Sequence, residues 1–136
     1  MEHMPITKQI LTYIEDHFEH QTEKELSLEN IARELNYSKF YIARTFKSHT
    51  GVTLYKYIQG RRMDLAARKL AETDRPIVEI AFEAGYGSQQ AFTQAFRHIY
   101  TCTPQEYRRK GCFMPKQGRI LYAMPAWKRK GGRVAA

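Results

Sequence analysis

Two stretches of this sequence, 38–47 and 88–97, carry side chains that suit contact with a nucleic acid. Arg44 can donate two hydrogen bonds to a guanine, whereas Lys39 and Lys47 suit phosphate groups. The second stretch offers amides in place of cations, and a glutamine side chain can pair with adenine through two hydrogen bonds. If both stretches are helices, the side chains that face outward are Lys39, Phe40, Tyr41, Ala43, Arg44 and Lys47 in the first and Gln89, Gln90, Ala91, Thr93, Gln94 and Arg97 in the second.

The two stretches belong to an internal repeat. Residues 31–46 read IARELNYSKFYIARTF, and residues 80–96 read IAFEAGYGSQQAFTQAF. The second copy has one extra residue, Gly87, after which Phe46 matches Phe96. A solenoid needs at least about three copies, so two copies indicate a duplicated recognition unit.

Each copy begins with a helix that ends in a tight turn. In the first copy Ser27 can cap a helix over 28–35, in which apolar residues recur at the i, i+3, i+4, i+7 spacing. Asn36 then ends this helix, because asparagine tolerates the left-handed conformation that a sharp turn requires. Gly85 is its counterpart in the second copy.

A second helix follows each turn. Ser38 and Ser88 can act as N-caps, and we expect helices over about 39–49 and 89–99. The layout is that of a helix-turn-helix, whose second helix enters the major groove of DNA. The serine hydroxyls and nearby backbone N–H groups also suit phosphates.

The rest of the chain also predicts helices. Apolar spacing indicates a leading helix over 6–18 and a longer connecting helix over 53–72, begun by a threonine. Gly60 lies inside the connecting helix, where it costs about 1 kcal/mol relative to alanine. Thr103, the proline after it and Glu106 have the pattern of a capping box and start a short last helix.

We therefore expect an all-α fold with about seven helices and no strand. Its predicted parts are a first helix-turn-helix subdomain over 1–52, the connecting helix over 53–72, a second helix-turn-helix subdomain over 73–110 and a basic C-terminal tail over 111–136.

The charge of the chain is unevenly distributed. The net charge is +8, but residues 108–136 hold nine Lys and Arg and no acid, whereas residues 1–107 hold 13 basic and 14 acidic residues. Residues 15–34 hold seven acidic and two basic residues, and residues 38–69 hold eight basic and one acidic. A basic face beside an acidic one gives a directed field, although charge alone slightly favours an ordinary solvated helical face.

Composition excludes several classes. Hydrophobic residues make up 43% of the 136, too much for a disordered chain. No apolar run approaches the roughly 20 residues that span a bilayer, and the N-terminus does not have the pattern of a secretion signal. We therefore expect a cytoplasmic protein. Cys102 and Cys112 match no common zinc or redox motif, so we expect no metal and no cofactor.

The two recognition helices differ in chemistry, because the first is cationic and the second is rich in amides. Phe40 suits a thymine methyl group, and Thr93 suits either a methyl or a polar partner. The DNA site should therefore be asymmetric. A connecting helix of about 20 residues spans about 30 Å, close to the roughly 34–36 Å of one duplex turn, which favours entry into adjacent major grooves.

A set of residues in both copies matches the pattern of a known family: Ile31-Ala32, Tyr37-Ser38, Phe46, Gly51, Tyr57-Ile58, Arg62-Met63, Ala66, Ile80-Ala81, Gly85-Tyr86, Ser88-Gln89, Phe92, Phe96, Pro104 and Tyr107. With this set, residues 6–110 resemble the DNA-binding region of AraC/XylS-type bacterial transcription regulators. The short length resembles the multiple-antibiotic-resistance and superoxide-response activators. The resemblance implies an activator that binds double-stranded DNA as a monomer and contacts RNA polymerase.

The resemblance also implies site residues. Base contacts are expected at Phe40, Ala43, Arg44, Gln89, Gln90, Thr93 and Gln94. Contacts to the DNA backbone are expected at Ser38, Lys39, Tyr41, Lys47, Ser88 and Arg97. The subgroup commonly has tryptophan where Phe40 stands, a polar residue at Ala43 and arginine at Gln94, so the preferred DNA sequence should differ.

Other interpretations remain open. The chain could be the DNA-binding part of a larger ligand-sensing regulator, with a strand starting near 119–124, although an extended tail whose basic run at 128–130 attracts phosphates is favoured. His17 and His20 lie close together, but no HExxH motif accompanies them, so we expect no enzyme. An RNA-binding module would need a stacking platform, which a helical pattern does not offer.

Overall fold

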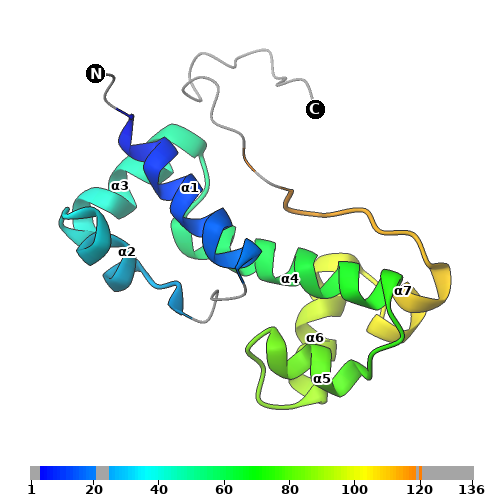
Figure 1. The fold of residues 1–136 in the computed structure, drawn as a ribbon. Coiled ribbons are helices and arrows are strands. Elements are labelled where there is room, and N and C mark those ends of the chain that lie inside the picture. The colour runs from blue at the N-terminus through cyan, green and yellow to red at the C-terminus, as the bar shows by residue number, and fades with distance from the viewer. Residues whose placement is uncertain (1–3, 21–24, 119, 121–136) are drawn as a thin grey trace, which may run out of the picture. The chain divides into compact units, whose positions relative to one another are not determined.

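The computed structural model describes residues 4–20, 25–118 and 120, and this part of the chain contains seven α-helices and no strand. The expected all-α fold is thereby confirmed. The helices, labelled in Figure 1, are α1 (Ile6–Glu19), α2 (Leu28–Leu35), α3 (Lys39–Thr50), α4 (Leu54–Glu72), α5 (Ile77–Glu83), α6 (Gln89–Tyr100) and α7 (Pro104–Lys110).

The chain divides into two compact units. Of the described residues, unit 1 comprises those up to Ile58 together with Ile120, and unit 2 comprises those from Gln59 to Gly118. Unit 1 thus holds α1, α2, α3 and the start of α4, and unit 2 holds the remainder of α4 with α5, α6 and α7. Each unit has its own hydrophobic core and contains one helix-turn-helix.

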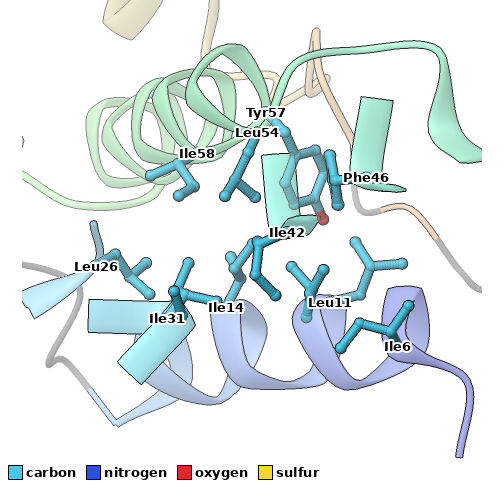
Figure 2. Close-up of a cluster of buried hydrophobic side chains, with 12 residues drawn as sticks. Ile6, Leu11, Ile14, Leu26, Ile31, Ile42, Phe46, Leu54, Tyr57 and Ile58 are labelled. Atoms are coloured by element: carbon cyan, nitrogen blue, oxygen red, sulfur yellow. The ribbon is translucent and has the colours of Figure 1, made fainter. Parts of the chain in front are cut away.

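The core of unit 1 forms where α1 packs against α2 and α3 and the first turn of α4 closes over them (Figure 2). The Phe46 and Tyr57 rings lie 5.7 Å apart between centroids, and the Tyr57 hydroxyl donates to Glu15 Oε2 at 2.7 Å. Full burial of one large apolar side chain contributes about 1.5–3 kcal/mol. The buried set is Ile6, Ile10, Leu11, Ile14, Leu26, Ile31, Ala32, Ile42, Phe46, Leu54, Tyr57 and Ile58.

The core of unit 2 is rich in aromatic rings. Phe96 stacks on Tyr100 with centroids 4.6 Å apart, and Tyr107 meets Phe96 edge-on at 5.5 Å. Such aromatic pairs add about 0.5–1.5 kcal/mol beyond the area they bury. The buried set is Met63, Ala66, Ala67, Leu70, Ile80, Ala81, Phe92, Phe96, Tyr100 and Tyr107.

The last helix is fixed at both of its ends. At the start, Thr103 Oγ1 accepts the Glu106 N–H at 3.0 Å and the Thr103 N–H donates to Glu106 Oε1 at 2.8 Å, which confirms the predicted capping box. Near the end, the Arg108 guanidinium donates to the carbonyl oxygens of Leu70 at 3.0 Å and Arg75 at 2.7 Å. Arg108 of α7 therefore provides a hydrogen-bond donor for one carbonyl in the last turn of α4 and for another in the loop that follows α4.

Two expectations for the C-terminal tail fall largely outside the described residues. The basic run at 128–130 lies there entirely, and so does the stretch 119–124 apart from Ile120. Ile120 is not part of a strand; it packs on the unit 1 core, and its N–H donates to the Tyr57 hydroxyl at 3.2 Å.

The two recognition helices end differently at matched positions. Gly51 ends α3 with φ of 83°, in the left-handed region that glycine adopts without strain. Thr101 ends α6 with φ of 60°, although a β-branched residue is strained in this conformation. The α6 terminus therefore stores strain that the α3 terminus avoids.

We expect Thr101→Gly to stabilise the protein by about 1 kcal/mol, since left-handed backbone costs an ordinary residue roughly 1–2 kcal/mol and glycine gives back part of that gain as entropy. Urea unfolding followed by circular dichroism would measure the change in the free energy of unfolding. Gly51→Thr is the matched control and should destabilise. A destabilising effect of Thr101→Gly would show that the Thr101 side chain contributes more than its backbone strain costs.

Candidate nucleic-acid interface

The turns that precede α3 and α6 begin in the same way, although the second turn is one residue longer. Asn36 has φ of 63° and ψ of 43°, and Gly85 has φ of 95°, so both turns pass through a residue with positive φ, as predicted. In each turn the N–H of the following tyrosine donates to the carbonyl five residues earlier, at 3.0 Å in the first turn and 3.1 Å in the second. These bonds satisfy helix carbonyls that would otherwise lack partners and fix the angle at which the next helix leaves.

Serine caps fix the start of both second helices. Ser38 Oγ accepts the Tyr41 N–H at 3.1 Å, and Ser88 Oγ accepts the Ala91 N–H at the same distance. A serine N-cap contributes about 1 kcal/mol to its helix. Both predicted caps are confirmed, and the ends of α3 and α6 lie within one residue of the predicted ones.

The two helices bury and expose the same positions. From 41 to 49 and from 91 to 99 the order of buried, half-buried and exposed residues is identical. The expected site residues are accordingly on the surface: Ser38, Lys39, Phe40, Tyr41, Arg44, Lys47, Ser88, Gln89, Gln90, Gln94 and Arg97 are exposed, and Ala43 and Thr93 are half-buried.

The exposed face of α3 combines an apolar ring with a cation. Phe40 is 72% exposed, and Lys39 Nζ lies 5.8 Å from the centroid of its ring. A ring exposed in this way is free to pack against an apolar group such as a thymine methyl. Lys39 also forms an ion pair with Glu29 at 3.8 Å, and Tyr41 stacks on Tyr37 with centroids 5.2 Å apart.

Glu29 and Tyr37 were not predicted as part of this site. They lie on α2 and in the turn, and they orient two side chains of α3, Lys39 and Tyr41. The turn brings Tyr37 back toward the first residues of α3, and only the folded turn shows this approach. The sequence signal was the tyrosine that follows the turn residue in both copies.

A network of charges holds α5, the first helix of the second helix-turn-helix. Glu83 accepts from Lys69 Nζ at 2.7 Å and from Arg75 Nη1 at 2.9 Å, and Arg75 also pairs with Glu79 at 3.4 Å. The hydrogen bonds from Arg75 and then Lys69 lower the pKa of Glu83 to about 2. The sequence alone does not indicate this network, because Lys69 and Glu83 are 14 residues apart on different helices.

His17 on α1 and His20, directly after its end, both contact backbone carbonyl groups. His17 Nδ1 lies 2.8 Å from the carbonyl oxygen of Tyr13, and His20 Nδ1 lies 2.9 Å from that of Asp16. Within the described ranges no group of three His, Cys, Asp or Glu side chains is placed to hold a metal ion. None of the helices found there has both the length and the apolar character that a membrane span requires.

Two capped helices that follow matched turns, with polar and aromatic faces exposed, define a helix-turn-helix protein with two such units. Residues 31–110 match the model of a helix-turn-helix domain. The chain belongs to the AraC/XylS family and is a DNA-binding transcription regulator.

Relatives in sequence and in structure agree with this assignment. The chain is 41% identical over 107 residues to the Transposon Tn10 TetD protein of Escherichia coli, covering 79% of this chain and 75% of that one. It is 38% identical over 110 residues to the Regulatory protein SoxS of Escherichia coli, covering 81% and 99%. The C-terminal domain of AraT, a response regulator from Geobacillus stearothermophilus, has the same fold with a TM-score of 0.68 and 36% identity, over 79% of this chain and 86% of that domain.

The Glu83 network gives a prediction for the pH dependence of stability. The pKa of Glu83 is lowered in the folded state, so its contribution is present above about pH 4.5 and is lost as the pH falls toward 2. Because its side chain is 39% exposed, solvent screening reduces the contribution to about 0.5–1 kcal/mol. Glu83→Gln should lower the melting temperature at pH 7 but have little effect near pH 2.

Glu72→Gln is the control for this measurement, since it removes an exposed i,i+4 pair with Arg68 at 3.1 Å. Such a pair is worth about 0.3–0.5 kcal/mol. Calorimetry at several pH values would separate the two variants. A pH-independent difference between Glu83→Gln and the native protein would contradict the assigned role of the Glu83 charge.

Proposed function

We propose that this regulator binds an asymmetric DNA site as a monomer, with α3 and α6 in adjacent major grooves. One observation carries the proposal: the two helices bury the same positions and expose different chemistry at matched ones. Arg44 corresponds to Gln94, and Lys39 corresponds to Gln89. Guanidinium and amide groups prefer different base edges, so two identical half-sites would leave one helix poorly matched.

We propose specific roles for side chains of both helices. Arg44 pairs with a guanine, Phe40 packs against a thymine methyl group, and Gln90 pairs with an adenine. The full set of proposed base contacts is Phe40, Ala43, Arg44, Gln89, Gln90, Thr93 and Gln94. The proposed contacts to the DNA backbone are Ser38, Lys39, Tyr41, Lys47, Ser88 and Arg97.

The proposal extends to the cellular role. Membership of the family supports an activator that contacts RNA polymerase in the cytoplasm and has no catalytic activity. A second candidate is that the chain acts as the DNA-binding part of a larger ligand-sensing regulator. The AraT structure favours this alternative, because there a similar domain is the C-terminal part of a response regulator.

Selection of bound sequences from random duplex DNA, at a stated salt concentration, tests the proposed binding mode. One asymmetric motif with two parts in successive major grooves is the expected result. A palindromic motif would instead mean that two copies of the chain bind symmetric half-sites, and the monomer model would then be wrong.

Arg44→Ala should weaken binding to the selected site by about 1–3 kcal/mol and relax the preference at one base pair, because a bidentate contact to guanine is lost. Lys47→Ala is the matched control on the same face of α3. It should weaken binding to all sequences similarly and reduce the salt dependence by about one phosphate contact. Fluorescence anisotropy with specific and random duplexes at several salt concentrations measures both effects. Equal losses on specific and random DNA for Arg44→Ala would exclude base reading by Arg44.

Gln90→Ala tests the second helix separately. We expect a loss of about 1–3 kcal/mol at one adenine of the second half-site, with the first half-site read as before. Competition among single-base variants of the selected site measures the preference at each position. If base preferences stay the same, α6 only contacts the DNA backbone.

A further inference from the structure

Unit 2 contains a buried carboxylate that no part of the DNA-reading scheme uses. Asp64 lies on α4 and is only 1% exposed. Its Oδ1 accepts the Tyr100 hydroxyl at 2.6 Å, and its Oδ2 lies 3.3 Å from Arg61 Nη1. A buried carboxylate is stable only when donors surround it, so the groups bound to Asp64 are held firmly.

The other donors come from a segment that follows α7. We name residues 114–118 the strap. The three successive backbone N–H groups of residues 116, 117 and 118 donate to the Asp64 carboxylate at 3.0, 3.3 and 2.8 Å. Gly118 has φ of 71°, and a backbone of this kind turns consecutive N–H groups toward one anion. At the other end of the strap, the Met114 N–H donates to the Tyr107 hydroxyl at 2.9 Å.

The strap also explains the glycine inside α4. A Cβ at Gly60 would lie 2.8 Å from the Cβ of Gln117, closer than packed side chains allow. The strap therefore passes so near to α4 that only glycine fits at position 60. The close approach of the Gln117 side chain therefore explains why α4 has a glycine at position 60 despite its low helix propensity.

The carboxylate connects the strap to a recognition helix. Tyr100 is the last residue of α6, its ring stacks on Phe96, and its hydroxyl also accepts the Lys116 N–H at 3.2 Å. Burial and the hydrogen bond to Asp64 raise the pKa of Tyr100, so the hydroxyl remains a donor. The strap lies beyond the 31–110 match to the family model.

We propose that the strap and Asp64 together position α6, and that Asp64 and Tyr100 are positioning residues for reading of the second half-site. The proposal rests on the proposed role of α6 in base contact. Loosening the strap should free the C-terminal turn of α6, and the exposed glutamines would then be held less well against their bases. Reading by α3, in unit 1, should not change.

The first test needs no DNA and uses the full chain with Gly60→Ala. By helix propensity alone this substitution would stabilise α4. With the strap docked it displaces Gln117, and amides near the end of α6 should exchange about tenfold or more faster, while amides of α3 stay the same. Adding Gln117→Gly removes the clashing Cβ and should restore slow exchange. Unchanged or slower exchange in α6 for Gly60→Ala would overturn the proposal.

The second test measures base preference with Tyr100→Phe, which removes one hydroxyl and keeps the stacked ring. Preferences in the second half-site should fall by about two- to tenfold, the range expected of one hydrogen bond, and those in the first half-site should not change. Equal weakening at both half-sites, or no change at either, would overturn the positioning role. If the native protein selects no preferred DNA sequence, the proposed function is wrong. The hydrogen-exchange test does not depend on DNA and tests the role of the strap separately.

Discussion

A single residue with positive φ between two helices sets the geometry on which both recognition units depend. At Asn36 and Gly85 the chain reverses through the left-handed region, and the next serine starts a new helix two or three residues later. If the turn were longer, the angle between the helices would no longer be fixed by local hydrogen bonds. The buried residues of α3 and α6 then keep each second helix against the first, and their exposed faces are presented in the same way.

Features set by nearby residues could be predicted from the sequence. Each cap, each turn and the capping box at Thr103 depends on groups within a few residues of one another, and their chemistry is specific. Helical periodicity likewise identified the core faces, because burial follows the repeat of the helix. The site residues were placed on exposed faces by the same reasoning, although the bases they contact remain a prediction.

Features set by distant residues could not be predicted. Asp64 accepts hydrogen bonds from N–H groups 52 to 54 residues later in the chain, and no local sequence pattern in either segment predicts this contact. Gly60 was noticed as a cost to its helix, but its reason is the Cβ of Gln117. The left-handed conformation of Thr101 at the end of α6 could not be predicted either, because a threonine disfavours it.

The two second helices differ in how far their exposed residues are independent of the residues that hold the helix in the fold. On α3 the exposed Arg44 and Lys47 lie opposite the buried Ile42 and Phe46, so changes in the reading face leave the core intact. On α6 the helix ends in Tyr100, which belongs at once to the aromatic core and to the Asp64 cluster. A change in the strap can therefore alter how α6 is held without touching an exposed side chain. If α6 reads bases as proposed, specificity of the second unit depends on buried polar contacts as well as on the exposed glutamines of α6.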